Sequence, residues 1–186
     1  MNRTGLSTCS TGCGERLPMI ASVDVAYHGR EASAACVLFR HWSDAHGERE
    51  IVARIGTVEE YRPGQFYRRE LPCLLAVLAM VREPLEAVIV DGYVWLGGTN
   101  KPGLGAHLYE ALGGTTAVIG VAKSRFAGAP GAAPILRGTS SRPLYVTTAG
   151  MDALVAARHI QSMHGAHRIP TLLKRADQVS RAGECA

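Results

Sequence analysis

Three acidic residues stand where a carboxylate is hard to explain as ordinary surface charge. Asp24 lies in the middle of the apolar stretch SVDVAY, and Asp91 ends the apolar run LEAVIVD. Glu70 stands at the start of a helix predicted over LPCLLAVL, because Pro72 suits the first turn of a helix. A charge inside a buried strand costs free energy unless it is paired or bound to metal. Converging carboxylates repel one another, and a divalent cation that prefers oxygen ligands, Mg²⁺ or alternatively Mn²⁺, would relieve the repulsion. Such a site can activate water and stabilise the leaving oxygen of a phosphodiester.

Each of these acids also has an ordinary structural explanation. Asp24 could pair with a buried arginine, and Asp91 could form a plain turn with Gly92. Glu70 could be favoured by the positive end of the helix dipole. The three positions together favour a shared metal site, because the predicted order of elements would bring them to one place.

Two further charged residues are candidates for the same site. Lys123 ends the apolar strand VIGVAK, where it could contact a phosphate or stabilise developing charge; it could also simply reach solvent. Asp152 opens the last long predicted helix, where it could be a fourth metal ligand or an N-cap acid, and both roles remain open. The candidate catalytic residues are therefore Asp24, Glu70, Asp91 and Lys123, and the candidate metal ligands are Asp24, Glu70, Asp91 and Asp152.

The elements that must position these residues follow a definite order. Three strands predicted at 19–27, 33–42 and 49–58 are joined by short links, which indicates an antiparallel meander. Helices and apolar strands then alternate. The later predicted elements are a helix from about residue 70, a strand at 85–95, a helix at 103–114, a strand at 115–123, a loop at 127–143, a strand at 143–150 and a helix at 151–165. This order predicts an α/β, ribonuclease H-like fold, with a mixed sheet covered by helices on both faces.

The composition fits one domain with its own core. The chain has 186 residues, of which 47% are hydrophobic, and no apolar run reaches the roughly 18 residues that a membrane helix needs. We expect a flexible N-terminal arm at 1–18, a single domain at 19–180 and a tail at 181–186. The five cysteines are odd in number and scattered, which is typical of reduced thiols and predicts a cytoplasmic protein.

Basic residues gather in two places along a chain of net charge +4. One cluster contains Arg62, Arg68 and Arg69, and the other lies near the C-terminus. The members of the second cluster are Arg158, His159, His164, His167, Arg168, Lys174 and Arg175. Two basic clusters in one small domain favour a nucleic-acid partner.

Several motifs in this order resemble those of the endonuclease V family, over about residues 19 to 180. SVDVAY resembles the first-strand motif of the family, whose metal-binding Asp falls on Asp24. YRPGQFYRREL resembles the segment Tyr-x-Pro-Gly that ends in Phe-Arg-Glu, which places the metal-binding Glu at Glu70. VDG resembles the next motif and gives Asp91, and IGVAKSRF gives Lys123. HRIPTLLKRAD resembles the C-terminal Arg-x-Pro segment of the family.

The resemblance implies a metal-dependent endonuclease that nicks DNA or RNA near inosine. The products would carry a 3′-hydroxyl and a 5′-phosphate, in nucleic acid repair or RNA processing. Tyr61 matches the aromatic wedge of the family, and an aromatic ring can replace the stacking lost when a nucleotide is displaced. Pro63 and Gly64 would fix the direction of the wedge, and Arg69 and Lys123 would lie near phosphates. We expect a monomer without a membrane partner.

The chain departs from the family pattern at the segment after the middle strand. Tyr93 replaces the first histidine of that segment, and Gly97 stands about where the second, catalytic histidine would be. Glu60 replaces a proline before the wedge. Tyr93 and Trp95 could stack on a base or belong to the core. These departures leave two alternatives: a lesion- or nucleic-acid-binding protein of the same fold that does not cleave, and a nuclease with another substrate, such as structured or modified RNA.

Overall fold

A computed structural model of the chain describes residues 17–60, 64–97, 101–127, 129 and 131–182. Most of the predicted arm and tail lies outside these residues, as do Tyr61 and Pro63 of the predicted wedge. Among the helices of the described residues, none is long and apolar enough to span a membrane.

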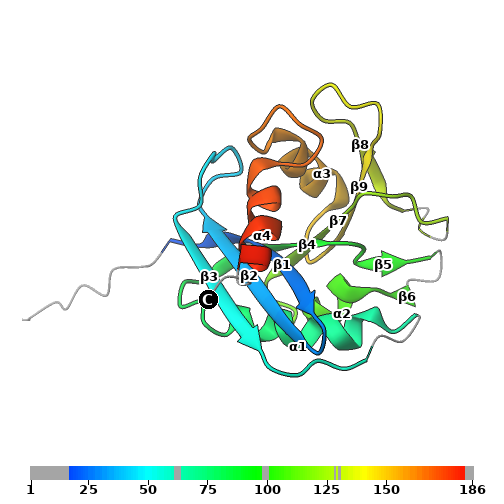
Figure 1. Cartoon of the computed structure of the whole chain (residues 1–186). Coiled ribbons are helices and arrows are strands. Elements are labelled where there is room, and N and C mark those ends of the chain that lie inside the picture. The colour runs from blue at the N-terminus through cyan, green and yellow to red at the C-terminus, as the bar shows by residue number, and fades with distance from the viewer. Residues whose placement is uncertain (1–16, 61–63, 98–100, 128, 130, 183–186) are drawn as a thin grey trace, which may run out of the picture.

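A seven-stranded mixed sheet forms the centre of the molecule (Figure 1), in the order β3-β2-β1-β4-β7-β9-β8. β1, β2 and β3 pair antiparallel. β4 lies parallel to β1, and β7 lies parallel to β4. β9 runs antiparallel to β7. The strands of this sheet are β1 (Met19–His28), β2 (Glu31–Phe39), β3 (Arg49–Ile55), β4 (Leu85–Asp91), β7 (Ala117–Ala122), β8 (Ala133–Ile135) and β9 (Leu144–Ala149). The predicted ribonuclease H-like sheet, an antiparallel trio followed by alternating helices and strands, is confirmed.

Alternate residues of the central strands face two separate cores, as a strand buried on both faces requires. In β4, Val88 and Val90 belong to the core under α1 and α2. Ala87 and Ile89 belong to the core under α3 and α4. Figure 1 shows the two helix pairs on opposite sides of the sheet. The helices are α1 (Phe66–Leu78), α2 (Leu104–Ala111), α3 (Ala153–Ser162) and α4 (Thr171–Ala182). The prediction of helices on both faces is therefore also confirmed.

The structure corrects the boundaries of several predicted elements. α1 begins at Phe66, so Pro72 lies in the helix interior and Glu70 lies in the second turn. A proline inside a helix removes one N–H bond and crowds the carbonyl four residues earlier, and the buried face around Leu74 holds the helix together across it. β4 ends at Asp91, before the residue 95 predicted, because Gly92 turns the chain with a φ of 127°. The predicted loop at 127–143 contains the short strand β8.

The segment after β4 folds back closely over the sheet. The backbone N–H of Val94 donates to Thr147 Oγ1 at 2.8 Å, and Trp95 Nε1 donates to the carbonyl of Thr148 at 3.0 Å. This approach requires glycine at position 120 of β7, because a Cβ there would lie 2.6 Å from the carbonyl oxygen of Gly92. This turn continues into the small β5–β6 ribbon, with β5 (Trp95–Leu96) and β6 (Lys101–Pro102). Trp95 is thus a partly buried core residue.

We predict that Gly120→Ala destabilises the fold by about 1–3 kcal/mol, the usual cost of an extra methyl group in a packed site. The new Cβ would push the Gly92 turn away from β7, which also moves Asp91. Urea denaturation measures the change in the free energy of unfolding. Gly56→Ala is the matched control, because nothing lies within 4 Å of a Cβ at that position. Equal stability of the two variants would contradict the prediction.

Candidate active site

Four carboxylates from four elements approach one another at one edge of the sheet. Val23 pairs with Val90 in neighbouring parallel strands, so Asp24 and Asp91 are the next positions of those strands. Glu70 reaches this edge from α1, and Asp177 reaches it from α4. All four line one open pocket of about 600 Å³, which we call the acid pocket. The carboxyl ends of parallel strands are the usual place for a site in an α/β sheet.

Glu70 is the most buried of the four acids, with 7% of its surface exposed. Its Oε2 atom is buried and has no hydrogen-bond partner among the described residues. Burial raises the pKa of Glu70 to about 8, and the Asp24 and Asp91 carboxylates add to the increase. A buried carboxylate with nearby like charges and an unused oxygen atom is the environment expected of a cation ligand.

Asp24 receives its main partner from α4. The Ser180 hydroxyl, which is fully buried, donates to Asp24 Oδ2 at 2.7 Å. Burial raises the pKa of Asp24, the Ser180 hydrogen bond opposes the increase, and the carboxylates of Asp177 and Asp91 add to it. No arginine is bonded to Asp24 within the described part of the chain, so the buried arginine considered from the sequence does not account for this acid.

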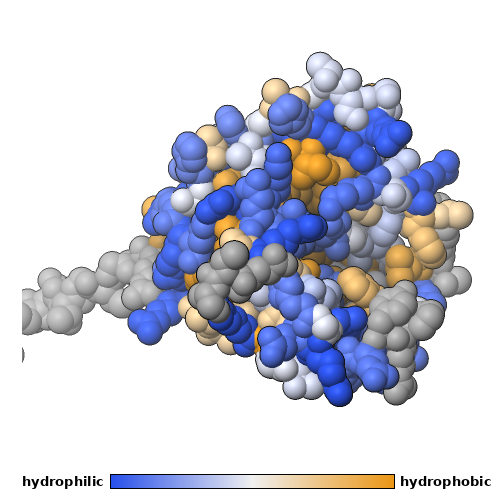
Figure 2. Space-filling model, viewed as in Figure 1, coloured by the Kyte–Doolittle hydropathy of each residue, from blue (hydrophilic) through white to orange (hydrophobic). Residues whose placement is uncertain are grey.

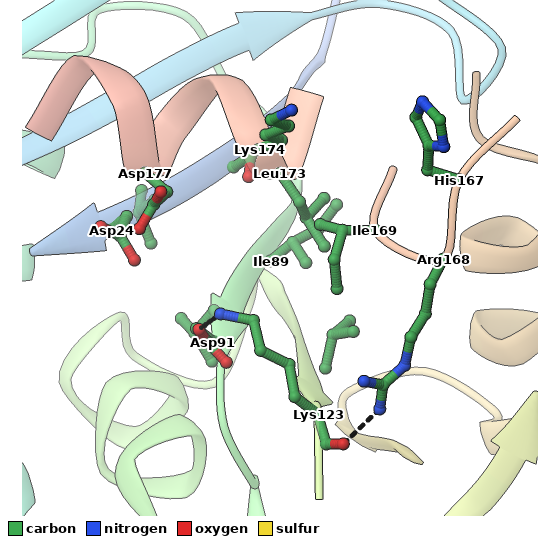
Figure 3. Close-up of a pocket in the computed structure, with 14 residues that line it drawn as sticks. Asp24, Ile89, Asp91, Lys123, His167, Arg168, Ile169, Leu173, Lys174 and Asp177 are labelled. Carbon is green, nitrogen blue, oxygen red and sulfur yellow. Dashed lines mark hydrogen bonds and ion pairs between the residues drawn. The ribbon is translucent and has the colours of Figure 1, made fainter. Parts of the chain in front are cut away.

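Lys123 lies directly after β7 and balances the charge of Asp91. Its Nζ atom donates to Asp91 Oδ2 at 2.5 Å, as Figure 3 shows. Burial works against the charged form of Lys123, but the hydrogen bond to Asp91 and the charges of the nearby carboxylates together outweigh it and raise the pKa of the lysine. Both side chains are about half exposed, at 51% and 43%, so the ammonium group remains accessible to a second anion.

Asp152 does not join the other acids. β9 is antiparallel to β7 and Ala149 pairs with Val118, so Asp152 follows the strand at the opposite edge of the sheet. There it caps α3, accepting hydrogen bonds from the backbone N–H groups of Leu154 and Val155, both at 3.0 Å. Of the two roles left open by the sequence, the structure shows the N-cap. The fourth acid of the pocket is instead Asp177, the last residue of the motif HRIPTLLKRAD.

The two arginines beside Glu70 point in different directions. The Arg69 guanidinium lies over the Tyr27 ring at 4.0 Å and contacts the carbonyl of Gly29 at 3.4 Å. Its predicted contact with phosphate therefore competes with packing. Arg68 is exposed and lines a neighbouring pocket. Gly64, the described residue of the predicted wedge turn, is exposed with a φ of 77°, a conformation that glycine adopts readily.

A second pocket of about 440 Å³ adjoins Asp91 on the side of α2. Its walls include Gly64, Leu96 and His107, and we call it the α2 pocket. Tyr93 also lines it, and its hydroxyl is fully engaged: it donates to the carbonyl of Ser124 at 2.7 Å and accepts from the N–H of Phe126 at 3.0 Å. Tyr93 therefore joins the turn after β4 to the segment after Lys123.

Two arginines that the sequence did not single out for the site hold nearby backbone in place, at Lys123 and before α4. Arg168 donates to the carbonyls of Lys123 and of Pro143, which fixes the backbone from which Lys123 extends. Arg137 is 5% exposed, and burial lowers its pKa. Its guanidinium donates to five carbonyl oxygens, one in the last turn of α3 and four in the segment between α3 and α4. The acceptors are Gln161, Met163, Gly165, His167 and Arg168. A sequence cannot reveal such contacts, because the acceptors are backbone atoms.

The residues of the acid pocket fit a hard divalent cation. Carboxylate oxygens are the ligands that Mg²⁺ and Mn²⁺ prefer, and the unpartnered oxygen of Glu70 is available to bind one. Within the described part of the chain, no three acidic, histidine or cysteine side chains already lie close enough to hold an ion. A cation bound here would have to draw the carboxylates together against the repulsion that raises the pKa of Glu70.

Comparison with known proteins gives one consistent result. Residues 8–178 match the family model described as Endonuclease V. An endonuclease V of Streptomyces avermitilis is 31% identical over 188 residues, covering 87% of this chain and 79% of the relative. The crystal structure of endonuclease V from that organism superposes with a TM-score of 0.71 at 30% identity, covering 90% of this chain and 82% of that one.

A more distant structure adds a bound ligand. Endonuclease V of Ciona intestinalis, in complex with a 24mer DNA containing an inosine followed by a ribo-adenosine, superposes with a TM-score of 0.72. It is 17% identical and covers 89% of this chain and 85% of that one. At this identity the likeness shows the shared fold.

We predict that Glu70→Gln stabilises the metal-free protein at neutral pH. Glu70 ionises in the unfolded chain at its ordinary value of 4.5 but at about 8 in the folded protein, so wild-type stability falls as the pH rises between these values. The gain for the variant should be roughly 3 kcal/mol at pH 7. Urea denaturation in EDTA at pH 4.5, 7 and 8.5 measures it. A stability difference that does not change with pH would contradict the prediction.

Proposed function

Because the chain belongs to the endonuclease V family, we propose that it is a metal-dependent endonuclease that nicks nucleic acid near inosine. Membership of this family implies that the protein is a nuclease. The observation that carries the metal dependence is the buried carboxylate of Glu70, which has an unpartnered oxygen atom and lies near Asp24 and Asp91. Such a carboxylate is costly without a cation.

Asp24, Glu70 and Asp91 would hold the ion, and Asp177 rather than Asp152 would complete the set. Mg²⁺ is our first choice and Mn²⁺ the second, by the oxygen chemistry of the ligands. The bound ion would supply an activated water molecule and stabilise the leaving oxygen of the phosphodiester. Hydrolysis on that pattern leaves a 3′-hydroxyl and a 5′-phosphate.

The other residues of the chain would position the substrate. Lys123, held beside Asp91, would stabilise charge on a phosphate oxygen. The α2 pocket next to Asp91 has the size and the mixed apolar and polar walls that suit a displaced base. Tyr61 would replace the stacking lost in the nucleic acid. The Ciona relative, which was crystallised with inosine-containing DNA, supports nucleic acid as the partner.

One observation favours a second candidate function, nucleic-acid binding without cleavage. The Tyr93 hydroxyl has both its donor and its acceptor capacity occupied by Ser124 and Phe126, so it does not offer a proton to the reaction. Gly97, near the position of the family's second histidine, has no side chain. Turnover by this chain must therefore rely on the metal site and Lys123. An RNA substrate remains a further alternative, because contacts to the 2′-hydroxyl separate RNA from DNA.

The direct test is nicking of inosine-containing DNA and RNA oligonucleotides in Mg²⁺. Asp91→Ala should lower kcat by at least about 100-fold, as removal of a group that stabilises the transition state does. EDTA should abolish nicking. Binding that is unaffected by metal, together with no nicking beyond the level of Asp91→Ala, would replace the proposal by the non-cleaving alternative.

Asp177 and Asp152 form a matched pair of variants for the fourth ligand. Asp177→Asn should lower nicking and weaken the increase in thermal stability that Mg²⁺ gives to the wild type. Asp152→Ala should leave nicking unchanged but lower the free energy of unfolding by about 1 kcal/mol, the usual cost of losing an N-cap. Nicking assays and thermal denaturation with and without Mg²⁺ measure both. Loss of nicking in Asp152→Ala alone would reverse our assignment.

A further inference from the structure

A third pocket opens beside the acid pocket, on the face of the sheet covered by α4. It holds about 340 Å³ and is drawn in Figure 3; we call it the α4 pocket. Its apolar walls come from three sources: Ile89 in β4, Ile169 in the segment before α4, and Leu173 in α4 itself. Figure 2 shows a patch of hydrophobic surface on this face, surrounded by hydrophilic side chains.

The rim of the α4 pocket carries charges of both signs. Asp24, Asp91 and Asp177 lie on the side of the acid pocket, as Figure 3 shows. Lys174 and Arg168 provide positive charge elsewhere on the rim. Lys174 is exposed, and the Arg168 guanidinium is bonded to backbone carbonyls rather than to a carboxylate. Lys174 is therefore available to an anionic ligand, whereas Arg168 adds positive charge from a fixed position in the wall.

The position of the α4 pocket relates it to the path of a substrate strand. Asp91 lines the acid pocket, the α2 pocket and the α4 pocket alike. The α2 pocket lies on the side of the sheet that carries α1 and α2, whereas the α4 pocket lies on the opposite face. A nucleic-acid strand whose phosphate lies at Asp91 can therefore place a nucleotide from one side of the cut in the α2 pocket. It can place a nucleotide from the other side of the cut in the α4 pocket.

The chemistry of the α4 pocket matches one nucleotide unit. A nucleobase has flat faces that pack between apolar side chains, as bases turned out of a helix do in other enzymes. Its phosphates require cations, and an exposed lysine serves as a point charge for them. Apolar walls next to a basic rim satisfy both requirements.

We propose that the α4 pocket binds the first nucleotide beyond the cut, on the side away from the inosine. Its base packs between Ile169, Leu173 and Ile89, and Lys174 contacts the phosphate that follows. This assignment rests on the proposed function, because the cut defines which nucleotide is meant. It adds a second base-binding site to the one proposed in the α2 pocket.

The test uses single-stranded inosine oligonucleotides in which one nucleotide at a time beyond the cut is replaced by an abasic unit. Fluorescence anisotropy in EDTA measures binding, and kcat/KM in Mg²⁺ measures nicking. For the wild type, loss of the first base should weaken binding about tenfold, within the range for one stacked base. Leu173→Asn keeps the size of the wall but makes it polar, and should reduce this penalty to less than about twofold.

Two charge variants test the phosphate contact. Lys174→Gln should lower the slope of log K against log salt concentration by about 0.7, the value for one phosphate contact in a single strand. Arg82→Gln is the matched control, because Arg82 is exposed in the turn before β4, at the opposite edge of the sheet. It should leave the slope unchanged. Equal slopes for Lys174→Gln and Arg82→Gln would overturn the phosphate contact.

The outcomes separate the pocket from the proposed function. If the wild type nicks the intact oligonucleotide but the abasic penalty is absent, or is as large in Leu173→Asn as in the wild type, the pocket assignment is wrong and the nuclease stands. If the wild type does not nick but the penalty in binding depends on Leu173, the α4 pocket still binds that nucleotide, now defined by its distance from the inosine, and the nuclease is wrong. Thermal denaturation of Leu173→Asn confirms that the variant is folded in these comparisons.

Discussion

Burial of the Glu70 carboxyl group beside other acids is the constraint on which the rest of the site depends. Glu70 lies in an almost closed position near two other acids, so its negative charge is unfavourable without a cation. The metal-free fold therefore contains a locally unfavourable negative charge. A divalent cation can neutralise this charge, whereas a neutral ligand cannot. Lys123 partly offsets the charge of Asp91 and Ser180 partly offsets that of Asp24, whereas the buried oxygen of Glu70 has no such partner in the part of the chain that the structure describes.

The sheet brings these charges together, and the loops hold them in place. Parallel pairing sets Asp24 beside Asp91, and the close approach of the Gly92 turn to Gly120 leaves that turn little freedom. Arg168 fixes the backbone of Lys123 from the far side. The two helix layers then leave hollows on both sides of Asp91, so the substrate surface follows from the way in which α1, α2 and α4 cover the sheet.

The fold and three of the acids could be predicted from the sequence because each depends on a local pattern. Apolar runs predict central strands, and an acid inside or at the end of such a run stands out, as Asp24 and Asp91 do. Asp152 could not be judged in this way, because only the antiparallel direction of β9 sends it to the opposite edge. Asp177 lies on an amphipathic helix, where an acid is ordinary. The helix start predicted from Pro72 is later than the observed start at Phe66, because tertiary packing tolerates a proline inside α1.

Arg137 has a consequence for how this region can vary in evolution. Among the described residues its guanidinium binds backbone carbonyls, and every residue type supplies a carbonyl. The contact therefore fixes the path of the segment before α4 without fixing its side chains. His167 and its neighbours can change chemistry while the wall of the α4 pocket keeps its position. The buried Arg137 thus fixes the backbone shape of the α4 pocket but not the side chains that select its ligand. Relatives of this chain could therefore bind different ligands there while keeping the same fold.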